Sequence, residues 1–370
     1  MDNCSKVHNT RYKRLEEALA VIEECKTETG FYASGDLYKH EYWTRDFSYS
    51  LEGLLEAGHA ETARKNLESL WDRQKLNGKL PVLFIKNKLP WMYNSLKKGR
   101  LKSFLGSFSG LVGIINSIFG VSDPTPHAVL ATYDYARITG DYSVIKAFAP
   151  RIKKAIDYIE RQYDDRMLVG CDWRDLMPEM KKKKLLSNQC LLYRIYCLSG
   201  LKEKAEILKQ RINENFWNGE FYISALDSAD FDVLGTSLAV RWGIIPKERY
   251  LKTALMLRRA SGQYGIKNMI LSSENYKIGK VRIAKCDQYG TIWPFVSYNA
   301  VVALHEMGCK EEALEEFNKL DNLPGFNEWY EPHSGRPCGS RDQLWSAAMY
   351  ITATKKLKTN SIPAYNIIDR

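Results

Sequence analysis

The stretch PHAVLATYDYARITG (126–140), followed directly by DYSVIKAFAPRIKKAIDYIE (141–160), contains the pattern that decides the fold. Its first part is rich in apolar and aromatic residues and ends in Gly140, whereas its second part is charged, with apolar residues at i, i+3 and i+4. That spacing forms one apolar face on a helix, and a glycine just after a helix commonly takes the left-handed conformation that ends it. The stretch therefore predicts a helical hairpin, with a buried helix first and a half-exposed helix second.

The same pattern recurs along the chain, and the glycines that end the apolar parts are Gly58, Gly140, Gly200, Gly243 and Gly308. An outer helix near 11–25 and an inner helix near 341–356 add a sixth pair across the termini. The spacing between the glycines varies from 43 to 82 residues, which fits poorly with an open solenoid of regular repeats. We therefore expect an all-α fold, a closed (α/α)6 toroid of six helical hairpins (twelve helices), forming a single domain over residues 1–370.

Two segments lie outside this repeat. Residues 96–120, LKKGRLKSFLGSFSGLVGIINSIFG, run from basic into apolar, Gly/Ser-rich sequence, and we expect a lid-like insertion packed over the mouth of the ring. The alternative is an interfacial helix that makes peripheral membrane contact, because cationic residues precede Phe, Leu and Ile. Residues 358–370 are expected to form a tail.

Composition excludes several classes of protein. The 370 residues are 45% apolar with 12 prolines, which is typical of a compact protein with a large core. We find no apolar window long enough to span a membrane and no apolar leader after the basic N-terminus. The eight cysteines form no CxxC pair, so we expect reduced thiols, a cytoplasmic location and neither a metal nor another cofactor. The net charge of +10 is spread along the chain without a nucleic-acid motif, so we expect no nucleic-acid partner.

The connections that precede the inner helices are long and carry acids and tryptophans. Because each of them precedes an inner helix, all must lie on one rim of the ring, where function is expected. They are HEYWTRD (40–46), VSDPTP (121–126), GCDWRD (170–175), FDV (231–233), CDQYGTIWP (286–294) and GFNEWYEPHSGRPCGSRDQ (325–343).

Acids beside tryptophans at a concave rim favour a carbohydrate site, in which aromatic faces stack on sugar rings and carboxylates bind hydroxyls. The rim tryptophans are Trp43, Trp173, Trp293 and Trp329. Glycoside hydrolysis needs two carboxyl groups, one protonated and one ionised. Generic chemistry does not choose among the seven rim acids, which are Asp46, Asp123, Asp172, Asp175, Asp287, Glu328 and Glu331.

Six segments in chain order resemble the motifs of inverting (α/α)6-barrel glycosidases. That group contains processing α-glucosidase I and its bacterial relatives, trehalase, and the amylo-α-1,6-glucosidase domain of glycogen debranching enzymes. The likeness covers roughly residues 30–355, through WTRDFSYSLEGLLEAG (43–58), QKLNGKLPV (74–82), SDPTPHAVLATYDYARITGD (122–141), GCDWRD (170–175), TIWPFVSYNAVVAL (291–304) and NEWYEPHSGRPCGSRDQLWSAA (327–348).

The resemblance implies an inverting glycoside hydrolase that releases a terminal α-linked glucose, with Asp172 as general acid and Glu328 as general base. It also implies that sugar contacts come from Trp43, Arg45, Asp46, Asp123, Asn188 and Trp293. The chain departs from the pattern at Cys171, where several relatives carry Trp, and it offers Asp175 as an alternative acid. Glu331 is an alternative base.

Two other functions remain open at this point. The same toroid can serve a sugar isomerase or epimerase that uses histidines, and His40, His127 and His333 lie near the rim. A non-catalytic carbohydrate-binding or membrane-associated scaffold is the second alternative. The sequence leaves the glycoside and its linkage undetermined.

Overall fold

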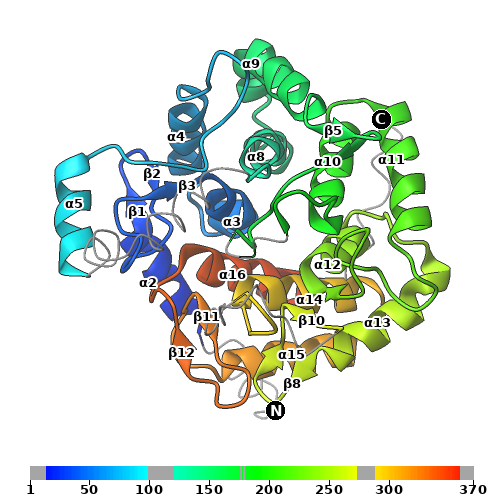
Figure 1. The fold of residues 1–370 in the computed structure, drawn as a ribbon. Helices are drawn as coiled ribbons and strands as arrows, with labels where there is room; N and C mark the ends of the chain where they lie inside the picture. The colour runs from blue at the N-terminus through cyan, green and yellow to red at the C-terminus, as the bar shows by residue number, and fades with distance from the viewer. Residues whose placement is uncertain (1–13, 99–120, 176, 178–179, 273–287, 359–370) are drawn as a thin grey trace, which may run out of the picture.

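The inner wall of the molecule is a closed ring of helices. The computed structural model describes residues 14–98, 121–175, 177, 180–272 and 288–358. Within these residues each inner helix packs against the next, and the last packs against the first (Figure 1). The inner helices are α3 (Thr44–Glu56), α8 (Pro124–Thr139), α10 (Leu186–Leu198), α12 (Val233–Arg241), α14 (Pro294–Glu306) and α16 (Leu344–Lys358).

The outer helices surround this ring and bury one face each. In α9, for example, Val144, Phe148, Ile152, Ala155 and Ile159 are buried at helical spacing. This confirms the predicted all-α (α/α)6 toroid, because apolar residues at that spacing bind an amphipathic helix to the wall beneath it. The outer helices are α2 (Leu15–Cys25), α4 (Ala60–Trp71), α9 (Ser143–Glu160), α11 (Lys202–Asn215), α13 (Tyr250–Arg259, after the 3-10 turn η2 Lys247–Arg249) and α15 (Lys310–Asp321).

The inner helices α3, α8, α10, α12 and α14 end just before a glycine, as predicted. The five glycines that punctuate the sequence have φ between 68° and 90°, and they are Gly58, Gly140, Gly200, Gly243 and Gly308. Residues with a side chain rarely adopt this left-handed conformation, so glycine stops the inner helix at little cost.

Short antiparallel ribbons order the connections on the opposite side, next to the N-termini of the inner helices. In the described residues they pair β1 (Lys26–Thr27) with β2 (Gly30–Phe31), β3 (Tyr42–Trp43) with β4 (Leu83–Phe84), β5 (Tyr163–Asp164) with β6 (Met167–Leu168), β7 (Phe231–Asp232) with β10 (Met269–Ile270), β8 (Ser261–Gly262) with β9 (Gly265–Ile266), and β11 (Trp329–Tyr330) with β12 (Pro337–Cys338). These ribbons fix the main chain of the rim loops, which the sequence had left unassigned.

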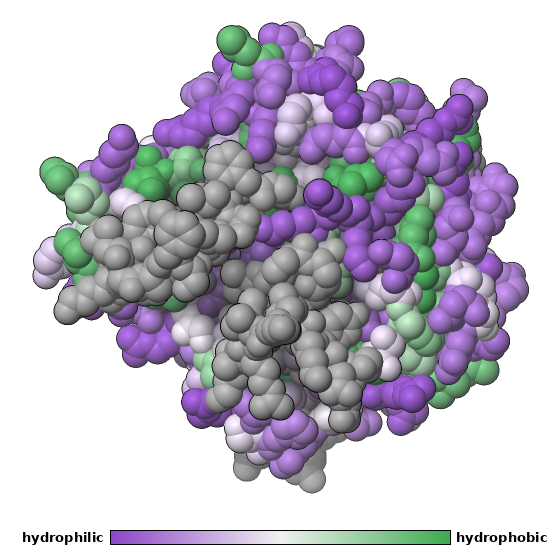
Figure 2. All heavy atoms as spheres, viewed as in Figure 1, coloured by the Kyte–Doolittle hydropathy of each residue, from purple (hydrophilic) through white to green (hydrophobic). Residues whose placement is uncertain are grey.

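One helix was not predicted. Helix α5 (Lys88–Lys97) projects from the ring (Figure 1), and its Leu89 and Tyr93 are 78% and 69% exposed. In Figure 2 most of the described surface on this face is hydrophilic, and apolar side chains gather at the edge where α5 lies. Apart from its first residues, the predicted insertion 96–120 lies outside the described residues, as does the tail beyond Lys358. Among the helices described, none is long and apolar enough to cross a membrane.

Candidate active site

The loops before the inner helices meet at the rim. Arg45, in the first turn of α3, donates from Nη2 to Oδ2 of Asp175 at 2.7 Å, although 130 residues separate them. Gln288 donates from Nε2 to the carbonyl of Trp173 at 3.0 Å and to Oδ1 of Asp175 at 3.3 Å. The segments 40–46, 170–175 and 286–294 therefore build one site, as far as the structure describes them; Asp287 lies outside the described residues.

Four charged side chains form what we call the Arg45 cluster: Arg45, Asp46, Asp123 and Asp175. All are 7% exposed or less. Burial, together with Glu328, Asp175 and Asp123, raises the pKa of Asp46 well above its ordinary value, although Arg45 opposes the shift. Burial also raises the pKa of Asp123 to about 7. These raised pKa values favour the protonated forms of Asp46 and Asp123, which is the condition a general acid or a hydroxyl-binding acid requires.

The carboxyl group of Asp123 lacks hydrogen-bond partners within the described part of the chain. Neither of its carboxyl oxygens has one there, and the same holds for Nε and Nη1 of Arg45 and Nε2 of His127. Arg45 Nη1 lies 3.8 Å from Asp123 Oδ2, and His127 Nε2 lies 3.7 Å from it. Buried polar groups are costly without partners, so this spot favours the hydroxyl groups of a ligand or water.

Asp172, unlike Asp123, has hydrogen-bond partners on both carboxylate oxygens. Its Oδ1 accepts from the backbone N–H of Arg174 at 3.0 Å and from Nε of Arg174 at 3.1 Å. Its Oδ2 accepts from Arg174 Nη2 at 2.8 Å and from the hydroxyl of Ser187. Arg174 also contacts Asp232 at 3.3 Å. Burial would raise the pKa of Asp172, but Arg174 and Ser187 outweigh it and hold that pKa below its usual value.

Glu328 is held on both carboxylate oxygens. Tyr38 donates its hydroxyl to Oε1 at 3.0 Å, and the backbone N–H of Ser340 donates to Oε2 at 2.9 Å. A Cβ added to Gly339, whose φ is +68°, would lie 2.4 Å from that same Oε2. The carboxylate therefore has one fixed orientation, at the start of ribbon β11–β12.

Glu331, the alternative base, lies at the turn of the same ribbon. Its Oε2 accepts from the backbone N–H groups of His333 and Ser334 and from the Ser334 hydroxyl. Contacts of this kind stabilise a tight turn. Trp329 lies in β11 and is half-buried, and no contact described for it brings it to the Arg45 cluster.

Aromatic rings line the centre of the rim. The centroid of Trp173 lies 4.9 Å from that of Trp293 and 5.2 Å from that of Phe295. Trp345 stacks on Phe295 at 4.0 Å. The guanidinium of Arg45 lies over the ring of Trp43, with Cζ of Arg45 5.2 Å from the ring centroid. Trp173 and Trp293 are 2% and 3% exposed, so they are packed walls more than open stacking platforms.

Asn188 has an orienting position. Its amide nitrogen donates to the carbonyl of Gly170 at 2.9 Å and to the hydroxyl of Ser122 at 3.4 Å. These contacts hold the loop that carries Asp172 and Asp175 against the loop that carries Asp123.

The histidines do not form an acid–base pair in the described residues. His127 is buried and bonds Ser48 through Nδ1 at 3.1 Å, and burial and Arg45 lower its pKa to about 3. His40 contacts the hydroxyl of Tyr32 at 3.1 Å, while His333 is exposed in the ribbon turn. This arrangement disfavours the isomerase alternative.

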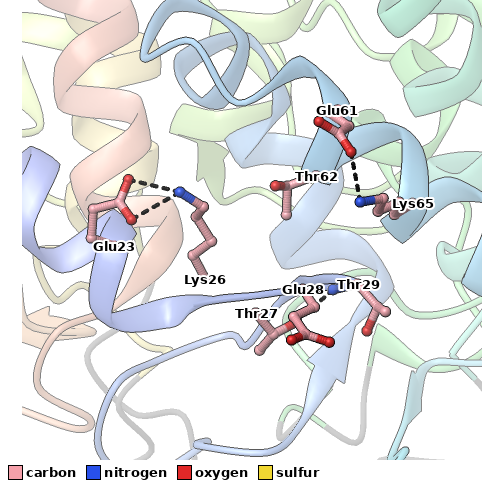
Figure 3. Close-up of a pocket in the computed structure, with 8 residues that line it drawn as sticks. All are labelled: Glu23, Lys26, Thr27, Glu28, Thr29, Glu61, Thr62 and Lys65. Carbon is pink, nitrogen blue, oxygen red and sulfur yellow. Dashed lines mark hydrogen bonds and ion pairs between the residues drawn. The ribbon is translucent and has the colours of Figure 1, made fainter.

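Other candidate sites are weaker. Within the described residues no group of three or more His, Cys, Asp or Glu side chains is arranged to hold a metal ion. A hollow of about 740 Å³ lies between α2, the β1–β2 ribbon and α4 (Figure 3). Four of its five charged residues form ion pairs, Lys26 with Glu23 and Lys65 with Glu61, and none of the predicted site residues lines it.

Several site residues were missed from the sequence. Arg174, Asp232 and Gln288 lie in quoted rim segments, but nothing in their spacing shows which carboxylate each one contacts. Tyr38 precedes the first motif and had no signal. Burial of charge through contacts between distant loops becomes visible only in three dimensions.

Part of the chain matches a known family of glycoside hydrolases. Residues 199–346 match the family model described as the mannosylglycerate hydrolase MGH1-like glycoside hydrolase domain. This confirms the resemblance drawn from the motifs and the glycoside hydrolase class. The matched range contains Glu328 but begins after the 170–175 segment. No curated protein matches the chain.

Solved structures share the fold. A glycosidase variant in complex with glucose is 16% identical, with a TM-score of 0.67 over 96% of this chain and 99% of its own. The GH63 mannosylglycerate hydrolase from Thermus thermophilus, in complex with Tris and D-glycerate, is 14% identical, with a TM-score of 0.68 over 92% of this chain and 99% of its own. At these identities the likeness supports the toroid, and the site must be argued from its own residues.

Proposed function

We propose that this glycoside hydrolase, a single catalytic domain, releases a terminal α-linked glucose with inversion. The observation that carries the proposal is the arrangement at the rim. There Glu328, fixed on both oxygens, acts electrostatically on Asp46 in the Arg45 cluster. The cluster also contains a carboxyl from the 170–175 segment. Single-displacement hydrolysis requires two carboxyl groups at one site, and these two loops supply them.

Glu328 is the proposed general base. It accepts a proton from the water that attacks the anomeric carbon, while an acid from segment 170–175 protonates the glycosidic oxygen. The resemblance assigns that acid to Asp172. Inversion requires about 6.5–9.5 Å between the two carboxyl groups, with room for one water. Tyr38 and Ser340 support the base by fixing the direction in which Glu328 receives the proton.

The Arg45 cluster is the proposed binding site for the terminal sugar. Arg45 supplies donors that have no hydrogen-bond partner within the described chain, and Asp123 supplies two carboxyl oxygens that also lack one there. The raised pKa of Asp46 favours its protonated form, which can donate to a hydroxyl. Trp43, Trp173 and Trp293 form the apolar walls, and Asn188 orients the acid-bearing loop. Binding energy at the terminal sugar would hold the anomeric carbon in line with the water.

A hexosyl glycerate is the second candidate substrate. The family match carries the description of a mannosylglycerate hydrolase, and one related structure binds D-glycerate. Both candidates share the hydrolytic step at an anomeric carbon and differ only in the sugar and the leaving group.

The test is sugar release from a panel of α-linked disaccharides, short glucans, glucosylglycerate and mannosylglycerate, with Glu328→Gln and Glu331→Gln run in parallel. We expect turnover of at least one glycoside, a loss of roughly 10³-fold or more in Glu328→Gln, and near wild-type rates in Glu331→Gln. The two glutamates are three residues apart, so this pair separates the base from a turn residue. Full activity in Glu328→Gln would overturn the assignment, and no release from any glycoside would contradict the proposed function.

A further inference from the structure

The two acids of segment 170–175 are held in different ways. Both oxygens of Asp172 accept two hydrogen bonds each, three of the four from Arg174. Arg174 is in turn fixed by Asp232. A general acid needs an oxygen that carries a proton and faces the substrate. Asp172 would have to break its contacts with Arg174 or Ser187 before it could meet that need, and a break with Arg174 would leave that buried arginine with only the longer contact to Asp232.

Asp175 lacks such a cage among the described residues. Its Oδ2 accepts from Arg45 at 2.7 Å, and its Oδ1 has the longer contact with Gln288 at 3.3 Å. Its side chain is 8% exposed, against 3% for Asp172. It also lies among the groups that act on Asp46 together with Glu328. Both acids of this segment act on Asp123, but Asp175 is the one that bonds Arg45 directly and has a carboxyl oxygen with only one long contact among the described residues.

Arg45 has a second acceptor within reach. Its Nη1 lies 3.8 Å from Asp123, too far for a hydrogen bond, and both Nε and Nη1 lack partners in the described chain. Both oxygens of Asp123 lack partners there as well. A small movement of the guanidinium toward Asp123 would satisfy these atoms and remove the cation that contacts Asp175.

Building on the hydrolase function above, we propose that Asp175 delivers the proton to the glycosidic oxygen, and that Asp172 is a positioning residue that holds the loop through Arg174. Substrate hydroxyls and Asp123 become the hydrogen-bond partners of Arg45 in place of Asp175. Oδ2 of Asp175 then no longer contacts the guanidinium and can carry a proton. In the reaction the Asp175 proton bonds to the glycosidic oxygen as the bond between that oxygen and the anomeric carbon breaks. The water oxygen bonds to the anomeric carbon, and its proton passes to Glu328. Asp175 ends ionised and Glu328 protonated, and exchange with solvent restores both.

The test compares substrates that do and do not need an acid. Fluoride leaves a sugar without protonation, so α-D-glucosyl and α-D-mannosyl fluoride bypass the proton donor, while the O-glycoside cleaved by the wild type requires it. Asp175→Asn, Asp172→Asn and Glu328→Gln are assayed on both kinds of substrate. We expect Asp175→Asn to lose roughly 10²- to 10⁴-fold on the O-glycoside and to stay within about tenfold of wild type on the fluoride. Asp172→Asn should lose similar factors on both, and Glu328→Gln should fail on both.

The opposite selectivity overturns the proposal. If Asp172→Asn spares the fluoride and Asp175→Asn does not, Asp172 is the donor. Equal losses of Asp175→Asn on both substrates would also overturn it, because a purely structural role acts on both. Wild-type protein that cleaves neither class of substrate would contradict the hydrolase function itself. Thermal melting then still tests the positioning role: Asp172→Asn, which loses contacts on both carboxylate oxygens, should melt further below wild type than Asp175→Asn, and equal melting temperatures of the two variants would refute it.

Discussion

At the scale of single residues, the buried charges at the rim differ in how fully they are paired. Both oxygens of Asp172 accept hydrogen bonds from Arg174 or Ser187, whereas both carboxyl oxygens of Asp123 and two nitrogens of Arg45 have no hydrogen-bond partner in the described chain. Paired buried charges hold a loop in place, and unpaired ones are costly unless a ligand completes them. The rim therefore combines a fixed frame with an incomplete binding site.

Removal of the Tyr38 hydroxyl should slow the chemical step. Tyr38→Phe deletes the donor to Glu328 Oε1, and a hydrogen bond to a charged group is worth about 1.5–3 kcal/mol. That corresponds to a loss of roughly ten- to hundredfold in kcat. Steady-state kinetics on the cleaved glycoside should show the loss in kcat with KM little changed. Tyr32→Phe, which alters a hydroxyl that contacts His40 instead, should keep wild-type kinetics; an equal loss there would refute the role of Tyr38.

Asp123 should make stability depend on pH. Its pKa is about 7 in the folded protein, raised by burial from an ordinary 3.8. Between these values the folded chain keeps a proton that the unfolded chain releases, so the free energy of unfolding falls as pH rises from 4 to 7 and levels off above 7. Melting curves at pH 5 and pH 7 should show this fall in wild type and a smaller one in Asp123→Asn. An identical pH dependence in both proteins would contradict the buried, protonated state.

Residue roles were only partly predictable. Arg45, Asp46, Asp123, Asp175 and Glu328 were expected at the rim because motifs on successive helix starts must meet there. The hydrogen bonds around Asp172 were not predictable. Arg174 is only two residues away in sequence, and which carboxylate it contacts depends on how the loop folds.

At the scale of elements, ribbon β11–β12 positions Glu328, the proposed base, and gives Gly339 a special role. Gly339 and Gly58 both have positive φ, +68° and +87°, but a Cβ at Gly58 meets nothing within 4 Å, while one at Gly339 meets Glu328. Both alanine variants bear the backbone strain of about 1 kcal/mol.

The Gly339→Ala variant should therefore lose activity beyond its loss of stability. We expect a loss of at least tenfold in kcat, since the added methyl group displaces the Glu328 carboxylate, and we expect Gly58→Ala to keep wild-type kcat with a slightly lower melting temperature. The assays are run below the melting temperatures of both variants, so that kcat is compared between folded proteins. Equal kcat values in the two variants would contradict a fixed base orientation.

Helical hairpins were predictable because a stop glycine and an amphipathic second helix are local signals. The two-residue strands were not, since alternation cannot be read from so short a segment. Helix α5 was also missed: its sequence KLPWMYNSLK contains a proline and keeps four apolar residues exposed, Leu89, Met92, Tyr93 and Leu96.

At the scale of the whole molecule, the ring closes where the first and last described helices pack together. Helix α2 packs on α16, and α16 packs on α3. Arg14 donates from Nη1 to the carbonyl of Leu320 at 3.2 Å and lies over the ring of Phe326 at 4.0 Å. The N-terminal segment thus supports the loop that leads to Glu328, a contact over more than 300 residues that no local pattern predicts.

Arg14→Ala should lower the free energy of unfolding by about 1.5–3 kcal/mol, because buried carbonyls lose a charged donor. Arg64→Ala removes two surface ion pairs from a side chain that is 43% exposed, and it should cost about 1 kcal/mol or less. Denaturant unfolding of both variants measures the difference. A cost for Arg14→Ala no greater than that for Arg64→Ala would argue against closure through the N-terminal segment.

Single-displacement hydrolysis is the central claim, and the anomeric form of the first product tests it most directly. A proton NMR time course of the purified protein with the α-glycoside it cleaves best should show the β-anomer first, with the α-anomer growing later by mutarotation, and neither in Glu328→Gln. First appearance of the α-anomer would mean retention, and it would contradict both the inverting mechanism and the role of Glu328 as a base acting on water.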